Sequence, residues 1–148
     1  MDDHLCTDYD VDYLAWLDQQ AALLRAGKFH QLDTANLIEE LEYMSDKQKN
    51  ALKNRLRILI AHLLKCQFQP THISGSWRGT LDTQRYKIER LLEKSPSLKP
   101  RLDAAIAWAY PHAIRLAAAE TGLPRSAFPV QNPYSTAQIL DPDYQPGA

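Results

Sequence analysis

Apolar residues recur every three or four positions along most of this chain, which is the spacing of one face of an α-helix. The longest such run covers residues 51–68. Its apolar stripe consists of Leu52, Leu56, Leu59, Ile60 and Leu63, and its opposite side carries Lys53, Asn54, Arg57 and Lys65. The chain has no sustained apolar–polar alternation, which a half-buried β-strand would require. The pattern therefore predicts an all-α fold built around a central helix over residues 51–68.

Two helices are predicted before the central one. The first is expected over residues 11–26, because Asp8 or Asp10 can cap its start and Gly27 can end it. Its apolar stripe would consist of Tyr13, Leu14, Leu17, Ala21 and Leu24. Asp33 can cap the second helix. The apolar side of that helix would consist of Leu37, Ile38 and Leu41, and its acidic residues are Glu39, Glu40 and Glu42.

The boundary between the second helix and the central one has two readings. Ser45 and Gln48 have the spacing of a capping box, in which a serine and a glutamine three residues later each bond the other's backbone N–H. This predicts a kink or a new helix start near Ser45. The alternative is a single helix over residues 34–67, about 50 Å long at 1.5 Å per residue.

Two further helices and a tail are predicted after the central helix. Pro70 ends the central helix, and Ser74 or Ser76 can cap the next one. The apolar seam of that helix would consist of Trp77, Leu81, Gln84, Ile88 and Leu91. The last long helix would present a face of Leu102, Ala105, Ile106, Ala109, Ala113, Leu116 and Ala117.

Proline and glycine shape the end of the chain. Pro111 lies inside the last long helix and predicts a kink, because proline cannot donate the backbone hydrogen bond. Gly122 is expected to end that helix. The proline-rich residues that follow predict an extended tail over residues 124–148, with one short helix over residues 136–140 that Ser135 caps.

Length and composition fit one helical domain over residues 1–148, with its core over about 9–123. Hydrophobic residues make up 45% and charged residues 24%, which is ordinary for a folded domain. We therefore predict an antiparallel bundle of four to five helices with the proline-rich tail attached. The acidic N-terminus has no signal-peptide features, and no apolar run approaches the roughly 20 residues of a membrane span. With two distant cysteines, Cys6 and Cys66, this favours a cytoplasmic protein with reduced thiols and no membrane partner.

Charge is distributed very unevenly. Residues 1–46 hold eleven acidic and two basic residues, a net charge of −9. Residues 47–101 hold thirteen basic and three acidic residues, a net charge of +10, and residues 102–148 carry −2. Blocks of opposite sign attract either each other or an external partner.

Eleven stretches of the chain resemble one known family. They are Tyr9-Asp10, Trp16-Leu17, residues 20–25, 37–41 and 63–65, Gln69-Pro70, residues 76–78, 95–98 and 120–124, Pro133-Tyr134, and residues 139–142. In this order, and over nearly the whole chain, they resemble the bacterial family called domain of unknown function 29. The resemblance implies a small, all-helical, cytoplasmic bacterial protein. It implies no established activity, cofactor or catalytic residue.

The sharpest candidate for chemistry lies on the central helix. Arg55 and His62 are seven residues apart, so they differ by about 20° around the helix axis, and Cys66 lies on the same flank. Arginine separated from a later histidine by four to six intervening residues, in a helical bundle, resembles the motif of the ribonucleases called HEPN domains. Both Arg57, with four intervening residues, and Arg55, with six, satisfy it against His62. His62 would move a proton at the ribose 2′-hydroxyl, and arginine would stabilise the transition state. The alternative is structural, since such side chains commonly bond a neighbouring helix.

Other candidate ligands are weaker. A metal could be held by His62, Cys66 and His72, but no CxxC, HExxH or Glu-x-x-His pattern supports such a site, so we predict no metal and no cofactor. His112 is expected to be a structural histidine. The tryptophans, expected to anchor the core or a groove, are Trp16, Trp77 and Trp108. Cations that would bind nucleic acid on one face are Lys47, Lys49, Lys53, Arg57, Lys65, Arg78, Arg85, Lys87 and Arg90.

Three functional hypotheses follow. The first is a non-enzymatic protein–protein interaction or self-association module, for which the charge asymmetry and the tail residues Tyr134, Leu140 and Tyr144 offer contact surfaces. The alternative is a HEPN-like ribonuclease using His62 with Arg55 or Arg57. The third is a nucleic-acid-binding module without catalysis.

Overall fold

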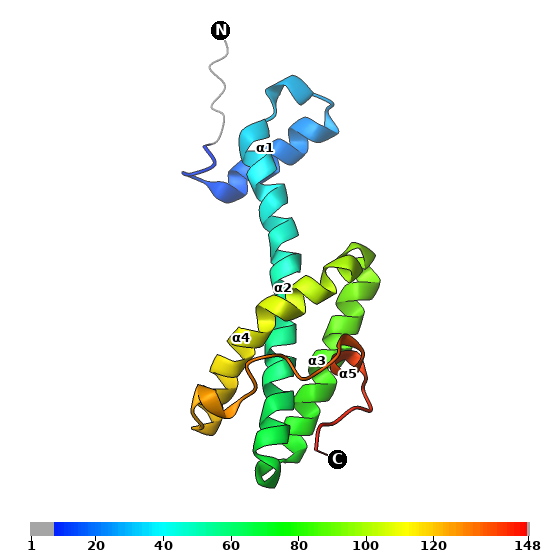
Figure 1. Ribbon diagram of the computed structural model, residues 1–148. Coiled ribbons are helices and arrows are strands. Elements are labelled where there is room, and N and C mark those ends of the chain that lie inside the picture. Colours follow the sequence, from blue (N-terminus) through cyan, green and yellow to red (C-terminus); the bar gives the residue numbers. More distant parts are fainter. Residues whose placement is uncertain (1–7, 148) are drawn as a thin grey trace. The chain divides into compact units, whose positions relative to one another are not determined.

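A computed structural model describes residues 8–147 and confirms the all-α prediction (Figure 1). Within these residues the α-helices are α1 (Tyr13–Arg25), α2 (Thr34–Phe68), α3 (Gly75–Lys94), α4 (Leu102–Thr121) and α5 (Thr136–Leu140). Short 3₁₀-helices connect them: η1 (Phe29–Gln31), η2 (Pro70–His72), η3 (Pro96–Arg101) and η4 (Arg125–Ala127). No β-strand occurs between residues 8 and 147.

Helix α2 is one uninterrupted helix of 35 residues. No new helix starts at Ser45, so the single-helix alternative is the correct one. The residues before Ser45 are already helical, and a helix interior pairs the N–H groups that a capping box would otherwise satisfy. The chain divides into two compact units, one ending at Lys47 and one beginning at Gln48. That the whole chain acts as one domain stays a prediction.

The first unit is a helical hairpin of α1, η1 and the part of α2 up to Lys47. Asp12 caps α1, because its carboxylate accepts a hydrogen bond from Ala15 N at 3.0 Å. The predicted caps Asp8 and Asp10 are wrong: the backbone carbonyl of Asp8 accepts from Asp12 N, which forms a turn ahead of the helix. Gly27 follows α1 with φ of 70°, a conformation that glycine adopts without strain.

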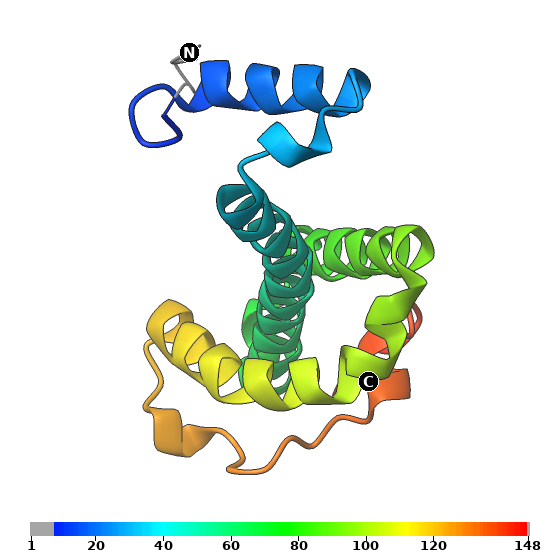
Figure 2. The same cartoon turned by 90° about the horizontal axis from the view of Figure 1, so that it is seen from above.

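The second unit consists of α2 from Gln48 onward, α3, α4 and the tail. Figures 1 and 2 show α3 beside this part of α2 and running in the opposite direction, with α4 also packed against it. The predicted stripe of the central helix is confirmed as core, since every member is at most 1% exposed: Leu52, Leu56, Leu59, Ile60 and Leu63. Ser74 caps α3 through Trp77 N, and Gly122 ends α4 with φ of 76°.

The α4 face and the tail complete this core. The buried residues of α4 include Ala105, Ala109, Ala113 and Ala117, whose small side chains let a neighbouring helix approach closely. Helix α4 continues on both sides of Pro111. The predicted short helix α5 is confirmed, with a capping box between Ser135 and Gln138. The tail packs on its own chain, because Tyr134 donates to Gln67 Oε1 at 2.6 Å and Ile139 is fully buried.

Candidate interaction site

The hairpin has a narrow, polar interior. Among residues 8–47 the structure buries only Trp16 and Gln20. Both meet Asp33 just before α2: Trp16 Nε1 donates to Asp33 Oδ2 at 2.9 Å, and Asp33 N donates to Gln20 Oε1 at 2.8 Å. Asp33 also accepts from Asn36 N at 3.4 Å, which confirms it as the cap of α2. Hydrogen bonds from the Asn36 side chain, and then from Trp16, hold the pKa of Asp33 below its usual value.

Two tyrosines fix one acidic residue of α2 within the hairpin. Tyr9 and Tyr13 each donate a hydrogen bond to Glu40, at 2.5 Å in both cases. These bonds lower the pKa of Glu40, Tyr13 contributing most, and the bond to Glu40 raises the pKa of Tyr9 to about 12. Glu40 is therefore ionised at neutral pH, and the hairpin keeps its negative charge.

The apolar faces of the hairpin point largely to solvent. Leu14 on α1 is 68% exposed and Leu41 on α2 is 65% exposed. The other exposed large apolar or aromatic side chains of the hairpin are Val11, Tyr13, Leu24, Phe29, Ile38, Tyr43 and Met44. The predicted core stripe of the first helix is therefore wrong for Tyr13, Leu14 and Leu24, and that of the second for Ile38 and Leu41. The buried line runs instead through Trp16 and Gln20, four residues apart, where Asp33 bonds the indole N–H of Trp16 and the amide oxygen of Gln20.

A basic groove lies between α2 and α3 in the second unit. It has a volume of about 410 Å³ and is lined by Gln48, Ala51, Arg55, Tyr86, Lys87, Arg90, Leu91 and Lys94. Four of these lining side chains are cationic, and no acidic side chain lines the groove in the described part of the chain. Ala51, Leu91 and Tyr86 add apolar surface. We call this feature the basic groove.

A smaller groove lies between α2 and the start of α4. Its volume is about 220 Å³, and it is lined by Lys49, Leu52, Lys53, Leu98, Arg101, Ala104, Ala105 and Trp108. The ammonium group of Lys53 lies 5.4 Å from the centre of the Trp108 ring, which is a cation–π distance. The His112 ring stacks at 4.3 Å from Trp108 in a tilted arrangement. His112 is half-buried, as a structural histidine should be.

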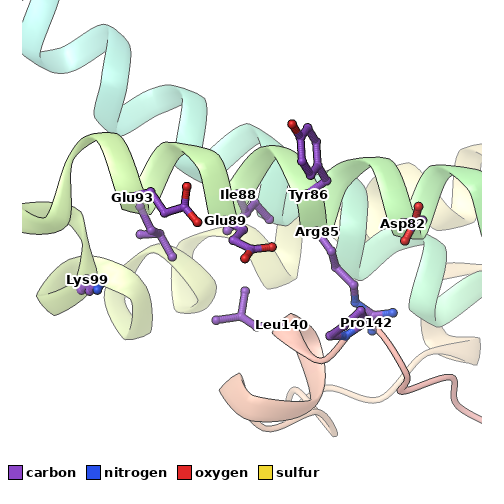
Figure 3. A pocket seen from close by; sticks show the side chains of 10 residues that line it. Asp82, Arg85, Tyr86, Ile88, Glu89, Glu93, Lys99, Leu140 and Pro142 are labelled. Atoms are coloured by element: carbon purple, nitrogen blue, oxygen red, sulfur yellow. The ribbon is translucent and has the colours of Figure 1, made fainter.

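A further groove lies between α3, η3 and the tail, and Figure 3 shows its lining side chains. Its volume is about 610 Å³. The charges around it are mixed: Asp82, Glu89 and Glu93 come from α3, with Arg85 and Lys99 as the cations. Arg85 is buried and committed to the fold, because its Nε donates to Ile139 O at 2.9 Å and its Nη2 to Gln138 O at 3.2 Å.

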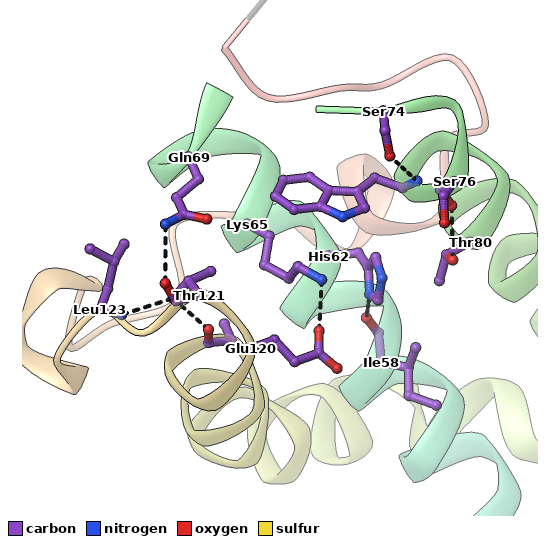
Figure 4. Close-up of polar contacts among 12 residues, drawn as sticks. Ile58, His62, Lys65, Gln69, Ser74, Ser76, Thr80, Glu120, Thr121 and Leu123 are labelled. Atoms are coloured by element: carbon purple, nitrogen blue, oxygen red, sulfur yellow. Dashed lines mark hydrogen bonds and ion pairs between the residues drawn. The ribbon is translucent and has the colours of Figure 1, made fainter. Parts of the chain in front are cut away.

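The three candidate catalytic residues, none of which the sequence establishes as catalytic, occupy different surroundings. His62 is only 9% exposed, and its Nδ1 lies 3.0 Å from the carbonyl oxygen of Ile58, one turn earlier on α2 (Figure 4). Arg55 lines the basic groove, which His62 does not. Arg57 is half-buried. Burial lowers the pKa of His62, because it disfavours the charged imidazolium. Cys66 is a fully buried free thiol whose pKa burial raises, so it is unsuited to act as a nucleophile.

Lys65 and Arg85 are in the wrong place for a phosphate-binding face. Lys65 was expected on the outer side of the central helix, but its Nζ lies 2.7 Å from Glu120 (Figure 4). The same Nζ lies 4.6 Å from the centre of the Trp77 ring. Arg85 bonds the end of α5. The bonds of Lys65 to Glu120 and of Arg85 to Ile139 could not be foreseen, because each joins residues more than fifty positions apart in the sequence. Lys94, by contrast, is absent from the cations that the sequence predicts for this face, although it lines the basic groove. Its spacing of seven residues from Lys87 places both on the same helical face.

The remaining candidates do not converge. Cys66 is buried, whereas His72 is exposed and bonds Thr71 Oγ1 at 3.1 Å. Within residues 8–147 no three His, Cys, Asp or Glu side chains gather closely enough to hold a metal ion. Cys6 lies outside the described residues. None of the helices between residues 8 and 147 combines the length and apolar character needed to cross a bilayer.

Comparison with known proteins places the chain in a family. No curated protein and no solved structure matches it. The model of one family, described as "Domain of unknown function DUF29", matches residues 9–145, which is nearly the whole chain. This agrees with the resemblance carried by the stretches between Tyr9 and Pro142. The chain belongs to the DUF29 family.

Proposed function

We propose that the protein is a non-enzymatic protein–protein interaction or self-association module, and that the hairpin of α1 and α2 is its contact element. The observation that carries this proposal is the exposure of both predicted apolar faces of the hairpin, including Leu14 and Leu41. A concentration of exposed large apolar side chains commonly marks a place where another molecule binds. A cytoplasmic location, with Cys66 as a reduced thiol, is part of the same proposal.

The rest of the described chain supports this assignment by contrast. Nine of the twelve exposed large apolar or aromatic side chains lie in the hairpin, and the second unit contributes Tyr86, Trp108 and Val130. Single exposed apolar residues are ordinary on protein surfaces. Nine exposed apolar or aromatic side chains within residues 11–44 are an unusual concentration. The hairpin buries Trp16 and Gln20 and leaves these nine side chains uncovered.

Photo-crosslinking tests the proposal in the full-length chain. A benzophenone amino acid replaces Leu41 in one variant and Phe29 in another, and the chain is irradiated in the living cells that express it. The matched control carries the same amino acid at Val130, which is 93% exposed but lies in the tail of the second unit. We expect discrete adducts with another polypeptide from both hairpin positions and none from Val130. Adduct yields at Leu41 and Phe29 no higher than at Val130 would overturn the proposal.

A further inference from the structure

We propose that the partner of the hairpin is a second copy of this chain, and that the α2 face of the hairpin docks in the basic groove of that copy. This inference rests on the proposed function and names its partner. It is carried by a match in charge, spacing and apolar character between two helical faces that lie in different compact units.

The docking face on α2 has an acidic row beside an apolar row. Glu39 and Glu42 are three residues apart, so they lie on one side of the helix, and both are exposed. Ile38 and Leu41 have the same spacing, are more than half exposed, and are the immediate neighbours of the two glutamates. The helix therefore presents two carboxylates and two branched apolar side chains together, and Asp46 continues the acidic row four residues after Glu42.

The receiving face on α3 repeats this spacing with opposite charge. Lys87, Arg90 and Lys94 are separated by three and four residues, as Glu39, Glu42 and Asp46 are. All three cations line the basic groove and are exposed. Two helices with one spacing can align their rows charge against charge, since both rise 1.5 Å per residue. Arg55 adds a fourth cation from α2, on the opposite wall of the groove.

The groove also suits the apolar row. Ala51 and Leu91 line it, and Tyr86, which is 61% exposed, stands at its edge. The ion pair that Arg90 forms with Glu93 is weak, because it is 3.6 Å long and both side chains are mostly exposed, so Arg90 stays able to bind another carboxylate. A partner that brings carboxylates and apolar side chains together fits this lining better than a bare phosphate backbone does.

The chain itself carries both halves of this match. Residues 1–46 have a net charge of −9 and residues 47–101 have +10, while the whole chain has only −1. Two copies therefore attract through their opposite blocks without a large overall repulsion. If each copy places its hairpin in the other's groove, the contact occurs twice around a two-fold axis, which is the commonest symmetry of homo-oligomers. A polyanionic nucleic acid could meet the same groove but would find no complementary charge in the acidic block.

Charge reversal with mixing tests this arrangement in the full-length protein. One variant, R90E together with K94E, makes the groove acidic; the other, E39K together with E42K, makes the hairpin basic. Sedimentation equilibrium should show the wild-type chain as a dimer that weakens with salt, and each variant with a dissociation constant raised roughly tenfold or more. Mixed in equal amounts, the two variants should form a heterodimer, because each acidic face then meets a basic one.

A control variant with charge reversals outside the groove distinguishes a specific contact from a general effect of net charge. The variant R115E together with R125E removes two exposed cations outside the groove and should dimerise as the wild type does. A wild-type chain that stays monomeric at high micromolar concentration, or two variants that fail to rescue each other, overturns the inference. Binding of a single-stranded RNA probe that only the groove reversal abolishes also overturns it, in favour of nucleic acid. Hairpin crosslinks to a different protein would refute the second copy while leaving the proposed function intact.

Discussion

Lys65 and Glu120 join α2 to α4 through an ion pair of 2.7 Å in which the two partners differ sharply in exposure. The lysine side chain is 8% exposed, whereas that of the glutamate is 40% exposed. The Trp77 ring of α3 covers the ammonium group at 4.6 Å. A buried ammonium is costly unless a charge or hydrogen-bond acceptor meets it. The pair therefore serves mainly to make Lys65 tolerable where three helices of the second unit meet.

This asymmetry predicts unequal effects of removing the two partners. E120Q leaves the ammonium of Lys65 buried without its counter-charge and should lower the free energy of unfolding by about 1–3 kcal/mol, discounted for the exposure of Glu120. K65M removes the buried charge and keeps the apolar stem, so its cost should stay below about 1 kcal/mol. Urea denaturation measures both. The exposed Glu93 supplies a control, since E93Q should be nearly neutral. A greater loss for K65M than for E120Q would contradict the argument.

His62 predicts a pH dependence of stability. Burial lowers its pKa below 6.5, and the repulsion of Lys65 adds to this, while the bond to Ile58 and the charge of Glu120 oppose it. Below about pH 6.5 the unfolded chain binds a proton on this imidazole that the folded chain binds only at lower pH. The free energy of unfolding must therefore fall as the pH drops below 6.5. In H62Q this part of the fall should disappear, as urea denaturation between neutral pH and pH 5 would show. An unchanged slope would mean that His62 does not titrate as its burial requires.

The buried position of His62 also bears on the ribonuclease hypothesis. A general base must reach the 2′-hydroxyl of its substrate, and this ring is instead enclosed and bonded within α2. We expect the purified wild-type protein and H62Q to hydrolyse a fluorescent single-stranded RNA at the same background rate, with R55A as a further comparison. Cleavage that the wild type shows and folded H62Q lacks would restore the catalytic hypothesis.

The central helix was predictable because two signals coincide in it. Its leucine and isoleucine stripe has helical spacing, and the same residues are those that α3 and α4 cover, from Leu52 to Leu63. The short helix α5 was predictable for a different reason: the bonds of its capping box, between Ser135 and Gln138, are local in sequence. Where periodicity or local hydrogen bonding determines an element, the amino-acid sequence alone is sufficient to predict that element.

The hairpin was not predictable in the same way. Periodicity shows that α1 and the first part of α2 are amphipathic, but it cannot show whether anything covers their apolar sides. The interior of the hairpin is instead determined by Asp33, the residue that caps α2. Asp33 forms hydrogen bonds with Trp16 and Gln20 of α1. The exposed faces that support the functional proposal therefore consist of residues that the sequence predicts as core and the structure leaves exposed.

Arg85 is expected to keep the C-terminal tail ordered. Its guanidinium is buried and donates to the carbonyl oxygens of Ile139 and Gln138, so it satisfies acceptors near the end of α5. R85M keeps most of the apolar stem but leaves these acceptors unpaired, which should cost about 1–3 kcal/mol. Because the lost bonds hold the tail, hydrogen exchange should accelerate first in residues 135–144 and not in α2. The exposed Arg115, on α4 in the same unit, provides the control R115M, which should leave exchange in the tail unchanged. Equal acceleration throughout the second unit would show that Arg85 supports the whole core and not the tail in particular.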